Sequence, residues 1–293
     1  MRTFGVEAAS IDAVTSAKAG RTVSLCIPCR NEVATIGSLV RTVRAELMTD
    51  VPLVDELIVL DDRSTDDTAL VAADAGATVV PIDDVHRVHG VGHGKGNALW
   101  ATLVASTGTF VVWCDADVTS FRAGWVARLL GPLVDHDDVA LVKAIYERPS
   151  HRGGGGRTTE LVARPLLSLY APELASLHQP LAGEFAARRD VMEAIPFVQG
   201  WGVEIAMLLD VAARCGVSAI GQVDLGVRVH RHRSLHELSV QAAEVTATLL
   251  ERVGGDPPVA RTLARADGTV VPLNLATRPP LATCRRGSDQ HTC

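Results

Sequence analysis

The chain has 293 residues, and 47% of them are hydrophobic, which is enough to bury a sizeable core as one large domain or two merged lobes. With 21% charged residues and a formal net charge of −6, the composition excludes disorder of the whole chain and an overall basic field that would attract nucleic acid. No apolar run reaches the roughly 20 residues that span a bilayer, so we expect no transmembrane segment.

The N-terminal segment and the cysteines predict a cytoplasmic protein. Residues 1–21 contain no continuous apolar stretch of the kind found in signal peptides, and we expect a loose leader there. Six cysteines in a chain of this length do not indicate a disulfide scaffold. Cys26 and Cys29 form a C-x-x-C pair, but no second pair follows. Two small buried strand residues are therefore favoured over a redox or zinc site, in a reducing compartment.

Strands and helices are predicted to alternate in the first half of the chain. Apolar strand patterns cover residues 22–28, 55–62, 77–82 and 109–117. Helical patterns cover residues 32–47, 64–76 and 94–108, with Ser64 or Thr65 as the expected cap of the second helix. This alternation is typical of an α/β fold, in which a mostly parallel, Rossmann-like sheet is flanked by helices on both faces.

The second half is less regular. Strands are predicted over 138–149 and 218–233, and residues 183–195 read as a short strand followed by a helix. Helices are predicted over 159–170, with a kink at Pro165, over 202–216 and over 235–253. A glycine-rich loop covers 150–159, and the proline-containing end of the chain, from 254, is expected to be an arm or tail.

Two carboxylates, Asp115 and Asp117, follow an apolar strand in the sequence "FVVWCDAD". In open α/β sheets ligands bind at the carboxyl ends of strands, and residues i and i+2 of an extended segment face the same side. Two neighbouring carboxylates repel each other unless a cation lies between them, and Mg²⁺ binds through one or two carboxylates together with substrate phosphates. Acids that cap the next turn are an equally favoured interpretation of these two residues alone.

Other strand ends carry polar groups as well. Asp61 and Asp62 end the strand over 55–62 and could accept hydrogen bonds from a base or ribose. Lys95 lies in "GHGKGNALW", a glycine-rich turn before a helix, where a cation and a helix N-terminus suit a phosphate. The turn does not fit the Walker A pattern, and no G-x-G-x-x-G follows the first strand, which disfavours a dinucleotide-binding dehydrogenase.

Taken together, "IPCRNE", "VLDDRSTDDT", "GKGNAL" and "DAD" resemble the nucleotide-sugar domain of family-2-like glycosyltransferases with the GT-A fold. From about residue 23 to residue 253, the chain is also similar to the glucosyl-3-phosphoglycerate synthases, through stretches such as "GGGRTTELVARPLL", "QPLAGEFAARRD" and "GWGVEIAMLLD". The resemblance implies a retaining glycosyltransferase (a hexosyltransferase) that moves glucose from UDP-glucose to 3-phosphoglycerate with Mg²⁺ or Mn²⁺. It also implies a GT-A fold with a smaller acceptor-binding lobe, and a homodimer.

The resemblance divides the chain into a leader (1–21), a nucleotide-sugar lobe (22–149), an acceptor lobe (150–253) and a C-terminal arm (254–293). The implied catalytic residues are Asp117, Glu204 and Lys95. The implied nucleotide-sugar-binding residues are Pro28, Cys29, Arg30, Glu32, Asp62, Lys95, Asp115, Ala116 and Arg228. The implied acceptor-binding residues are Gly156, Arg157, Thr159, Glu204 and His232, and the implied metal ligands are Asp117 and His230.

Several positions depart from the family pattern. Arg30 adds a cation near the expected nucleotide, Trp201 stands where tyrosine is usual, and His232 stands where the family has an asparagine. A paralogue with a different phosphorylated acceptor, sugar or base is therefore an alternative. A sugar-nucleotide pyrophosphorylase or a non-catalytic binder of sugar nucleotides is a second alternative, disfavoured because the loop after the first strand lacks the glycine-rich basic pattern that a pyrophosphorylase needs. No candidate nucleophile stands out, which favours front-side attack by the acceptor.

Overall fold

A computed structural model describes residues 1–5, 10–147, 156–229, 234–255 and 260–286. Its centre is an eight-stranded sheet of order β1-β9-β6-β7-β5-β2-β3-β4. In this sheet β7 runs antiparallel to both of its neighbours, β5 and β6, and every other neighbouring pair is parallel. The prediction of a mostly parallel sheet is confirmed. The eight strands are β1 (Arg2–Phe4), β2 (Val23–Cys29), β3 (Glu56–Asp61), β4 (Thr78–Pro81), β5 (Phe110–Trp113), β6 (Leu141–Glu147), β7 (Phe185–Arg188) and β9 (Ile220–Val227).

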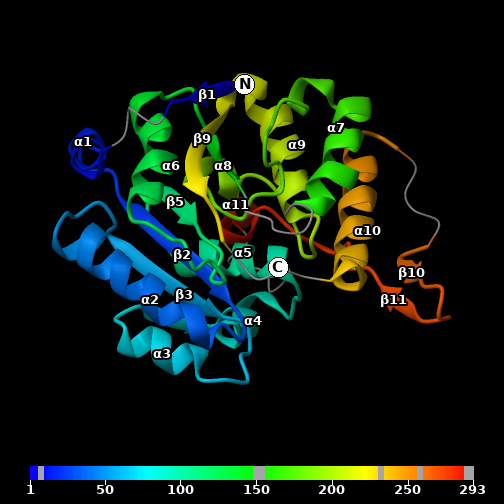
Figure 1. Ribbon diagram of the computed structural model, residues 1–293, viewed down its shortest axis with the longest axis horizontal. Coiled ribbons are helices and arrows are strands. Elements are labelled where there is room, and N and C mark those ends of the chain that lie inside the picture. The colour runs from blue at the N-terminus through cyan, green and yellow to red at the C-terminus, as the bar shows by residue number, and fades with distance from the viewer. Residues whose placement is uncertain (6–9, 148–155, 230–233, 256–259, 287–293) are drawn as a thin grey trace.

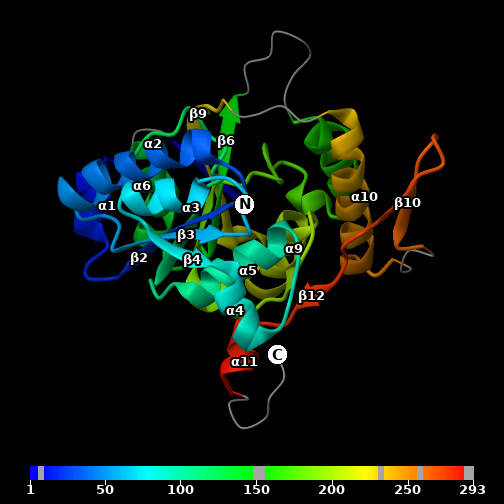
Figure 2. The same cartoon turned by 90° about the horizontal axis from the view of Figure 1, so that it is seen from below.

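Helices cover both faces of this sheet, as Figures 1 and 2 show. One apolar core lies between the sheet and α1, α2, α3 and α6, and the other lies between the sheet and α4, α5, α7, α9, α10 and α11. The helices are α1 (Ile11–Ala17), α2 (Val33–Val43), α3 (Thr68–Asp74), α4 (Ile82–His89), α5 (Lys95–Ala105), α6 (Gly124–Asp135), α7 (Arg164–Tyr170), α8 (Arg189–Glu193), α9 (Val203–Cys215), α10 (Leu235–Arg252) and α11 (Leu281–Arg286). No described helix is both long enough and apolar enough to cross a membrane.

Short segments complete the chain. Two of them are π-helical, η2 (Arg44–Thr49) and η3 (Thr159–Ala163), and two are 3₁₀ turns, η4 (Pro172–Leu174) and η5 (Val217–Ala219). The π-helical turn η3 lies directly before Pro165, where a kink was predicted, and such turns are a common cause of kinks. Two small sheets lie outside the large one: β10 (Thr262–Ala264) pairs with β11 (Val270–Pro272), and β8 (Phe197–Val198) pairs with β12 (Thr277–Arg278).

Both ends of the chain are more ordered than predicted. The expected loose leader contributes β1, which adds to the sheet in parallel beside β9, and α1, whose Val14 is buried in the core. The expected C-terminal arm contains the β10–β11 hairpin, which projects from the body (Figure 1), but it continues into β12 and α11, whose Leu281 is buried. These segments escaped prediction because three-residue strands and a seven-residue helix carry little periodicity.

The two cysteines of the C-x-x-C pair point to opposite faces of the sheet. Cys26 belongs to the core on the α5 side and Cys29 to the core on the α2 side, because they are three residues apart on β2. Both are unpaired and buried, and burial raises the pKa of the Cys26 thiol to about 12 and raises that of Cys29 further. The prediction of two buried strand residues, and not a redox or zinc site, is confirmed.

Candidate active site

The sheet places the carboxyl ends of β2, β3, β5, β6 and β9 along one edge, because these strands run parallel. The antiparallel β7 brings its amino end to the same edge, so the segment before Phe185 meets the segment after Trp113. The ladder between β2 and β5 stops at Cys26, so Pro28, which has no N–H group, needs no partner on that side. The strands therefore part at this edge and leave room for a pocket.

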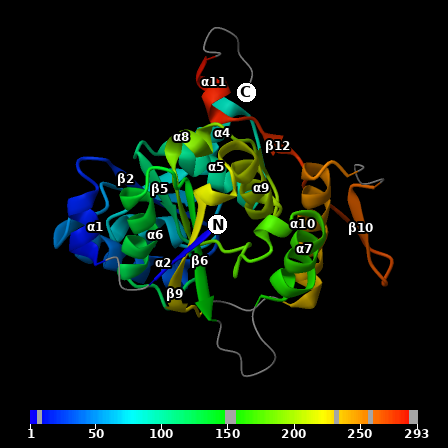
Figure 3. The ribbon, with the colours of Figure 1, turned by 90° about the horizontal axis from the view of Figure 1, so that it is seen from above.

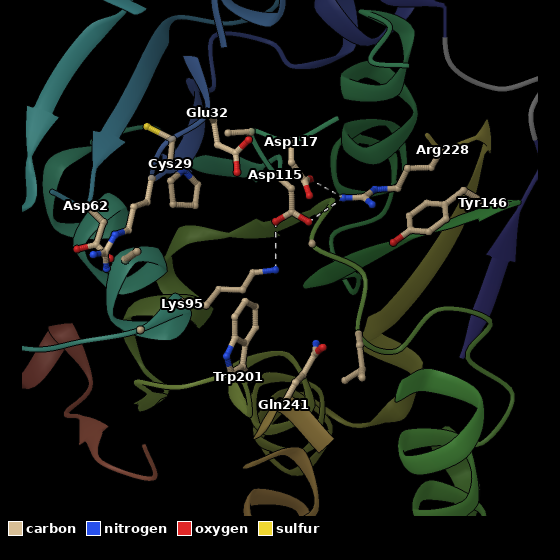
Figure 4. Close-up of a pocket in the computed structure, with 17 residues that line it drawn as sticks. Cys29, Glu32, Asp62, Lys95, Asp115, Asp117, Tyr146, Trp201, Arg228 and Gln241 are labelled. Carbon is tan, nitrogen blue, oxygen red and sulfur yellow. Dashed lines mark hydrogen bonds and ion pairs between the residues drawn. The ribbon is translucent and has the colours of Figure 1, made fainter. Parts of the chain in front are cut away.

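A pocket of about 450 Å³ lies at this edge (Figure 4). All nine residues that the resemblance assigned to the nucleotide sugar line it, and so does Asp117. Gly156, Arg157, Thr159 and Glu204 are not among its lining residues. The lining residues are Pro28, Cys29, Arg30, Glu32, Asp62, Gly94, Lys95, Ala98, Asp115, Ala116, Asp117, Tyr146, Leu181, Gly183, Trp201, Arg228 and Gln241.

Asp115 and Asp117 lie in a turn just after β5. The predicted strand over 109–117 is too long, since β5 ends at Trp113, so strand alternation does not explain why the two carboxylates lie together. They instead share a contact with Arg228, whose Nη2 lies 2.9 Å from Asp115 Oδ2 and 3.5 Å from Asp117 Oδ1. Gly183 makes room for this turn, because a Cβ there would overlap the Asp115 carboxylate.

Arg228 follows β9 and is almost fully buried, with a side chain 3% exposed. Besides the two aspartates, its Nε donates to Glu184 Oε1 at 2.7 Å, and its guanidinium lies over the Tyr146 ring at 5.4 Å. The second oxygen of Glu184, Oε2, is buried and has no hydrogen-bond partner among the residues that the structure describes. Burial raises the pKa of the Glu184 carboxyl, and Arg228 opposes that shift. Arg228 thus supplies positive charge at the aspartate pair from the end of β9, which β6 and β7 separate from β5 in the sheet.

Lys95 is the first residue of α5 and reaches two carboxylates from different parts of the chain. Its Nζ lies 2.7 Å from Glu204 Oε1 and 3.1 Å from Asp115 Oδ1. Burial disfavours its charged form, but these carboxylates outweigh that cost and raise the pKa of Lys95 above its usual range. Glu204, in the first turn of α9, is buried, and its side chain is 3% exposed. The pair joins α5 to α9 at the pocket, and Lys95 stays a cation there.

The backbone at the start of α5 does not lie open for a phosphate, contrary to the prediction. The N–H groups of Gly96 and Asn97 donate to the carbonyl oxygens of Gly200 and Gln199, in the loop between β8 and α9. A Cβ at Gly96 would overlap the carbonyl oxygen of Val198, so only glycine permits this approach. The loop therefore occupies these helix-terminal donors, and α5 lines the pocket with the side chains of Lys95 and Ala98.

Arg30, Glu32 and Asp62, which follow β2 and β3, also line the pocket. Burial raises the pKa of Asp62, while the nearby cation of Arg30 opposes the shift. The expected cap of α3 is wrong: the helix begins at Thr68, and Ser64 and Thr65 are bonded to Asn31 instead. These hydrogen bonds join the loop after β2 to the loop after β3. The same two loops contribute Arg30, Glu32 and Asp62 to the pocket lining.

The described end of the predicted acceptor loop, residues 156–159, lies beside α10. Gly156 adopts a positive φ of 84°, and the side chains of Thr158 and Thr159 are buried. Thr158 Oγ1 lies 3.5 Å from Gln241 Oε1, and Gln241 lines the pocket. Thr158 therefore contacts Gln241 of α10, and Gln241 in turn lines the pocket. The predicted metal ligand His230 and acceptor residue His232 lie outside the described residues, and within those residues no group of three or more His, Cys, Asp or Glu side chains is arranged to hold a metal.

Some pocket residues were not predicted. Tyr146, Gly183 and Gln241 line the pocket, and Glu184 contacts Arg228 beside it, only because β6, β7 and α10 are packed around the site. No recognised motif lies near these residues in the sequence, so they can be assigned to the site only when the order of the strands in the sheet is known. The resemblance did cover the stretch "QPLAGEFAARRD", which contains Gly183 and Glu184, but it gave neither residue a role.

Comparisons with known proteins match this architecture. A family model described as glycosyl transferase family 2 matches residues 24–195. Glucosyl-3-phosphoglycerate synthase of Mycolicibacterium smegmatis is 46% identical over 282 residues, covering 92% of each chain. The Mycobacterium tuberculosis glucosyl-3-phosphoglycerate synthase, solved with Mn²⁺, UDP-glucose and phosphoglyceric acid, has a TM-score of 0.87 and 44% identity, covering 94% of this chain and 95% of its own.

A second structure of the M. tuberculosis enzyme, in complex with phosphoglyceric acid, gives a TM-score of 0.89 at 43% identity and covers 97% of this chain and 99% of its own. The similarity therefore extends through both halves of the chain. The predicted GT-A architecture is confirmed. The chain therefore belongs to glycosyl transferase family 2, within which it is similar to the glucosyl-3-phosphoglycerate synthases, and it is a glycosyltransferase.

Proposed function

We propose that this chain transfers glucose from UDP-glucose to the free hydroxyl of 3-phosphoglycerate, with retention at the anomeric carbon and with Mg²⁺ or Mn²⁺ bound. The observation that carries the proposal is the pocket itself. It unites Asp115, Asp117 and Lys95 from the first half with Arg228 from the second, in a chain 46% identical to a glucosyl-3-phosphoglycerate synthase along nearly its whole length.

The aspartates fit a hard divalent cation. Both are carboxylates that face the pocket, with side chains 24% and 20% exposed, and oxygen ligands are what Mg²⁺ and Mn²⁺ prefer. Asp117 is the better candidate for direct contact, since its link to Arg228 is the longer one and it has no ion pair with Lys95. When bound, the cation would offset negative charge on the donor diphosphate. His230 is the candidate ligand from the second half of the chain.

The protein's own cations flank the same place. Lys95 and Arg228 both contact Asp115, from α5 and from the end of β9. A diphosphate in the pocket would lie beside both groups, and negative charge that develops on it as the sugar leaves would be stabilised by fixed charges that need no rearrangement. At the other end, Glu32 and Asp62 would accept hydrogen bonds from the ribose and base.

Retention by front-side attack is consistent with the ion pairs that hold the two buried carboxylates near the pocket. Glu204 is buried and paired with Lys95, and Glu184 is buried and paired with Arg228. A carboxylate that is held in an ion pair is a weak nucleophile, and neither side chain lines the pocket. In this mechanism the acceptor hydroxyl bonds to the anomeric carbon from the side of the leaving diphosphate, and a diphosphate oxygen takes the hydroxyl proton.

The acceptor would lie between the predicted phosphate loop and Trp201. Arg157 and the glycine-rich backbone before it supply the donor types that hold a phosphate, and Gln241 and Trp201 line the adjoining part of the pocket. A solved structure of the M. tuberculosis enzyme contains Mn²⁺, UDP-glucose and glycerol 3-phosphate. Glycerol 3-phosphate is therefore the natural comparison for testing whether the acceptor carboxylate matters here.

The test is an assay of nucleoside diphosphate release. Wild-type protein with Mn²⁺ is incubated with UDP-, GDP- or ADP-glucose, alone and with 3-phosphoglycerate or glycerol 3-phosphate. We expect release from UDP-glucose that depends on 3-phosphoglycerate and is lost on Asp117→Ala, while the circular dichroism spectrum is unchanged. Asp84→Ala, which removes an exposed carboxylate paired with the neighbouring Arg87, is the matched control and should retain activity.

The alternatives predict different outcomes of the same assay. Release that requires another acceptor, base or sugar would show a paralogue with altered specificity. Nucleoside triphosphate formed from pyrophosphate would indicate a pyrophosphorylase. Binding of UDP-glucose without turnover for any acceptor would indicate a non-catalytic binder. Each of these results contradicts the proposed function.

A further inference from the structure

The C-terminal segment 273–281 crosses the second half of the molecule and ends in the core. Figures 2 and 3 show β12 running past α5, α9 and α10 toward α11. Thr277 and Arg278 pair with Val198 and Phe197 of β8, and Leu281 is buried. We call residues 273–281 the C-terminal strap. It belongs to none of the functions assigned above, and the sequence analysis treated it as part of an arm.

Arg278, within the strap, is a buried cation with three separate acceptors. It is 5% exposed; its Nε donates to Asn97 Oδ1 at 2.9 Å, its Nη1 to the His89 carbonyl at 2.6 Å, and its Nη2 to the Gly90 carbonyl at 2.7 Å. His89 is the last residue of α4 and Gly90 is its C-cap, and the helix dipole favours a cation at this end. The guanidinium also lies 4.9 Å from the centre of the Trp100 ring. Arg278 thus joins the end of α4 to the first turns of α5.

The loop that Arg278 holds leads directly to Lys95. It comprises residues 90–94, between α4 and α5, and a Cβ at Gly92 would collide with the Asn97 and Arg278 side chains. A second strap residue, Asn274, donates its Nδ2 to the His93 carbonyl at 2.7 Å. Since a shift of this loop would move the first residue of α5, the strap fixes where the Lys95 side chain starts.

The strap also contacts the loop between β8 and α9, which carries Trp201. The N–H of Gln199 donates to the Ala276 carbonyl at 2.7 Å, and Glu244 of α10 accepts from the N–H groups of Asn274 and Trp201, both at 2.7 Å. This is the loop whose carbonyls accept from the start of α5. One segment therefore holds, from outside the pocket, both backbone stretches that place Lys95 and Trp201.

We propose that Arg278 is a positioning residue for the donor site: through the 90–94 loop it sets the place of Lys95 against the donor diphosphate. The inference rests on the proposed function for the identity of the donor. Arginine is required because a lysine offers one ammonium to three acceptors that belong to different segments, whereas the guanidinium fork reaches all three at once. Asn274 holds the same loop through one side-chain hydrogen bond, to the His93 carbonyl, and should therefore affect the position of Lys95 less than Arg278 does.

The experiment measures UDP affinity by calorimetry in the presence of Mn²⁺, together with KM for donor and acceptor, in full-length variants. Arg278→Met keeps the packing on Trp100 but removes the three donors, and we expect UDP binding and the donor KM to worsen about 10-fold or more, since a misplacement near 1 Å has large effects. The KM for 3-phosphoglycerate should stay within about twofold of wild type. Arg278→Lys and Asn274→Ala should show smaller losses in the same direction, and they also serve if Arg278→Met fails to fold.

The control is Arg261→Met, the same change outside the strap, at an exposed arginine whose ion pair, with Glu251, is 4.0 Å long. It should behave as wild type. Equal weakening of donor and acceptor, or UDP binding unchanged in all three strap variants, would overturn the inference. If wild type binds UDP but transfers to no acceptor, the proposed function fails, and the variants' UDP affinities still decide the role of Arg278. If wild type does not bind UDP, both fail.

Discussion

At the residue scale, Lys95, which lines the pocket, forms an ion pair with the buried Glu204, and this pair should be sensitive to substitution. Glu204 is 3% exposed at its side chain, so removing Lys95 would leave a buried carboxylate facing Asp115 without its cation. Breaking a buried pair by removing one partner typically costs about 3–5 kcal/mol. We expect Lys95→Met to lower the free energy of unfolding by an amount of this order and Glu204→Gln to lower it less.

The measurement is a double-mutant cycle by urea unfolding. The Lys95→Met/Glu204→Gln variant should be more stable than the sum of the two single changes predicts, because the second change removes the orphaned charge. Strict additivity would show that the two side chains are not coupled and would contradict the geometry. The two variants that lack Lys95 should lose glycosyl transfer, since Lys95 lies beside the proposed place of the diphosphate.

Lys143 gives a pH-dependent prediction. It is 1% exposed, its Nζ donates to the Ala182 carbonyl at 2.6 Å and lies 4.5 Å from the Phe185 ring centre, and burial lowers its pKa to about 8. Between pH 8 and its usual value of 10.5, the unfolded chain binds a proton that the native chain does not, so this group makes stability rise with pH. The full gain is about 3 kcal/mol, at 1.36 kcal/mol per pKa unit.

The comparison that isolates this group is wild type against Lys143→Met, by urea unfolding at several pH values from 7.5 to 10. We expect wild type to gain stability relative to the variant as the pH rises, whatever the offset between them at pH 7.5. Parallel pH profiles would mean that Lys143 keeps its ordinary pKa. Activity is a poor readout here, because Lys143 lies next to the segment that contacts Asp115.

At the scale of elements, the contact between α5 and the β8–α9 loop offers a matched pair of glycines. Gly96 is the second residue of α5 and meets the Val198 carbonyl, whereas Gly124 is the first residue of α6 and a Cβ there would meet nothing within 4 Å. We expect Gly96→Ala to lower the melting temperature and weaken UDP binding, because the loop must move. Gly124→Ala should be neutral or more stable by up to about 1 kcal/mol. Similar behaviour of the two variants would contradict this packing.

The sequence predicted elements well where periodicity was strong. The strands β2, β3, β4 and β6 and the helices α2, α5, α9 and α10 lie within a few residues of their predicted ranges. Helices α4 and α6 were not predicted. The first carries charged and histidine residues on most of its length, and the second contains Gly131 and Pro132 in mid-helix, which read as a break. Both helices form because they pack against the sheet, and not because their residues have a high helix propensity.

The same limit applies to the site. The strand-end rule correctly predicted that Asp62, Asp115 and the end of β2 would meet, because parallel strands share an edge. It could not predict that β7 inserts between β5 and β6 in the opposite direction. That insertion brings Gly183 and Glu184 beside Asp115 and Arg228, and it is visible only in the strand order.

At the scale of the whole molecule, the pocket depends on segments from almost the entire chain. The strands from the first half supply the aspartates, β9 supplies Arg228, and α5 and α9 supply Lys95 and Glu204. The C-terminal strap then binds the loops before α5 and α9 from outside. The division into four segments at residues 21, 149 and 253 stays a prediction, as does the homodimer.

The central claim is that this assembled pocket performs retaining glucosyl transfer to 3-phosphoglycerate. NMR of the product made from UDP-glucose labelled with ¹³C at the anomeric carbon tests it most directly, because it reports the acceptor and the configuration together. We predict one product, an α-glucoside at the only free hydroxyl of 3-phosphoglycerate, formed by wild type and by Asp84→Ala but not by Asp117→Ala. A β-glucoside, free glucose alone, or labelled sugar trapped on a protein carboxylate would contradict the account.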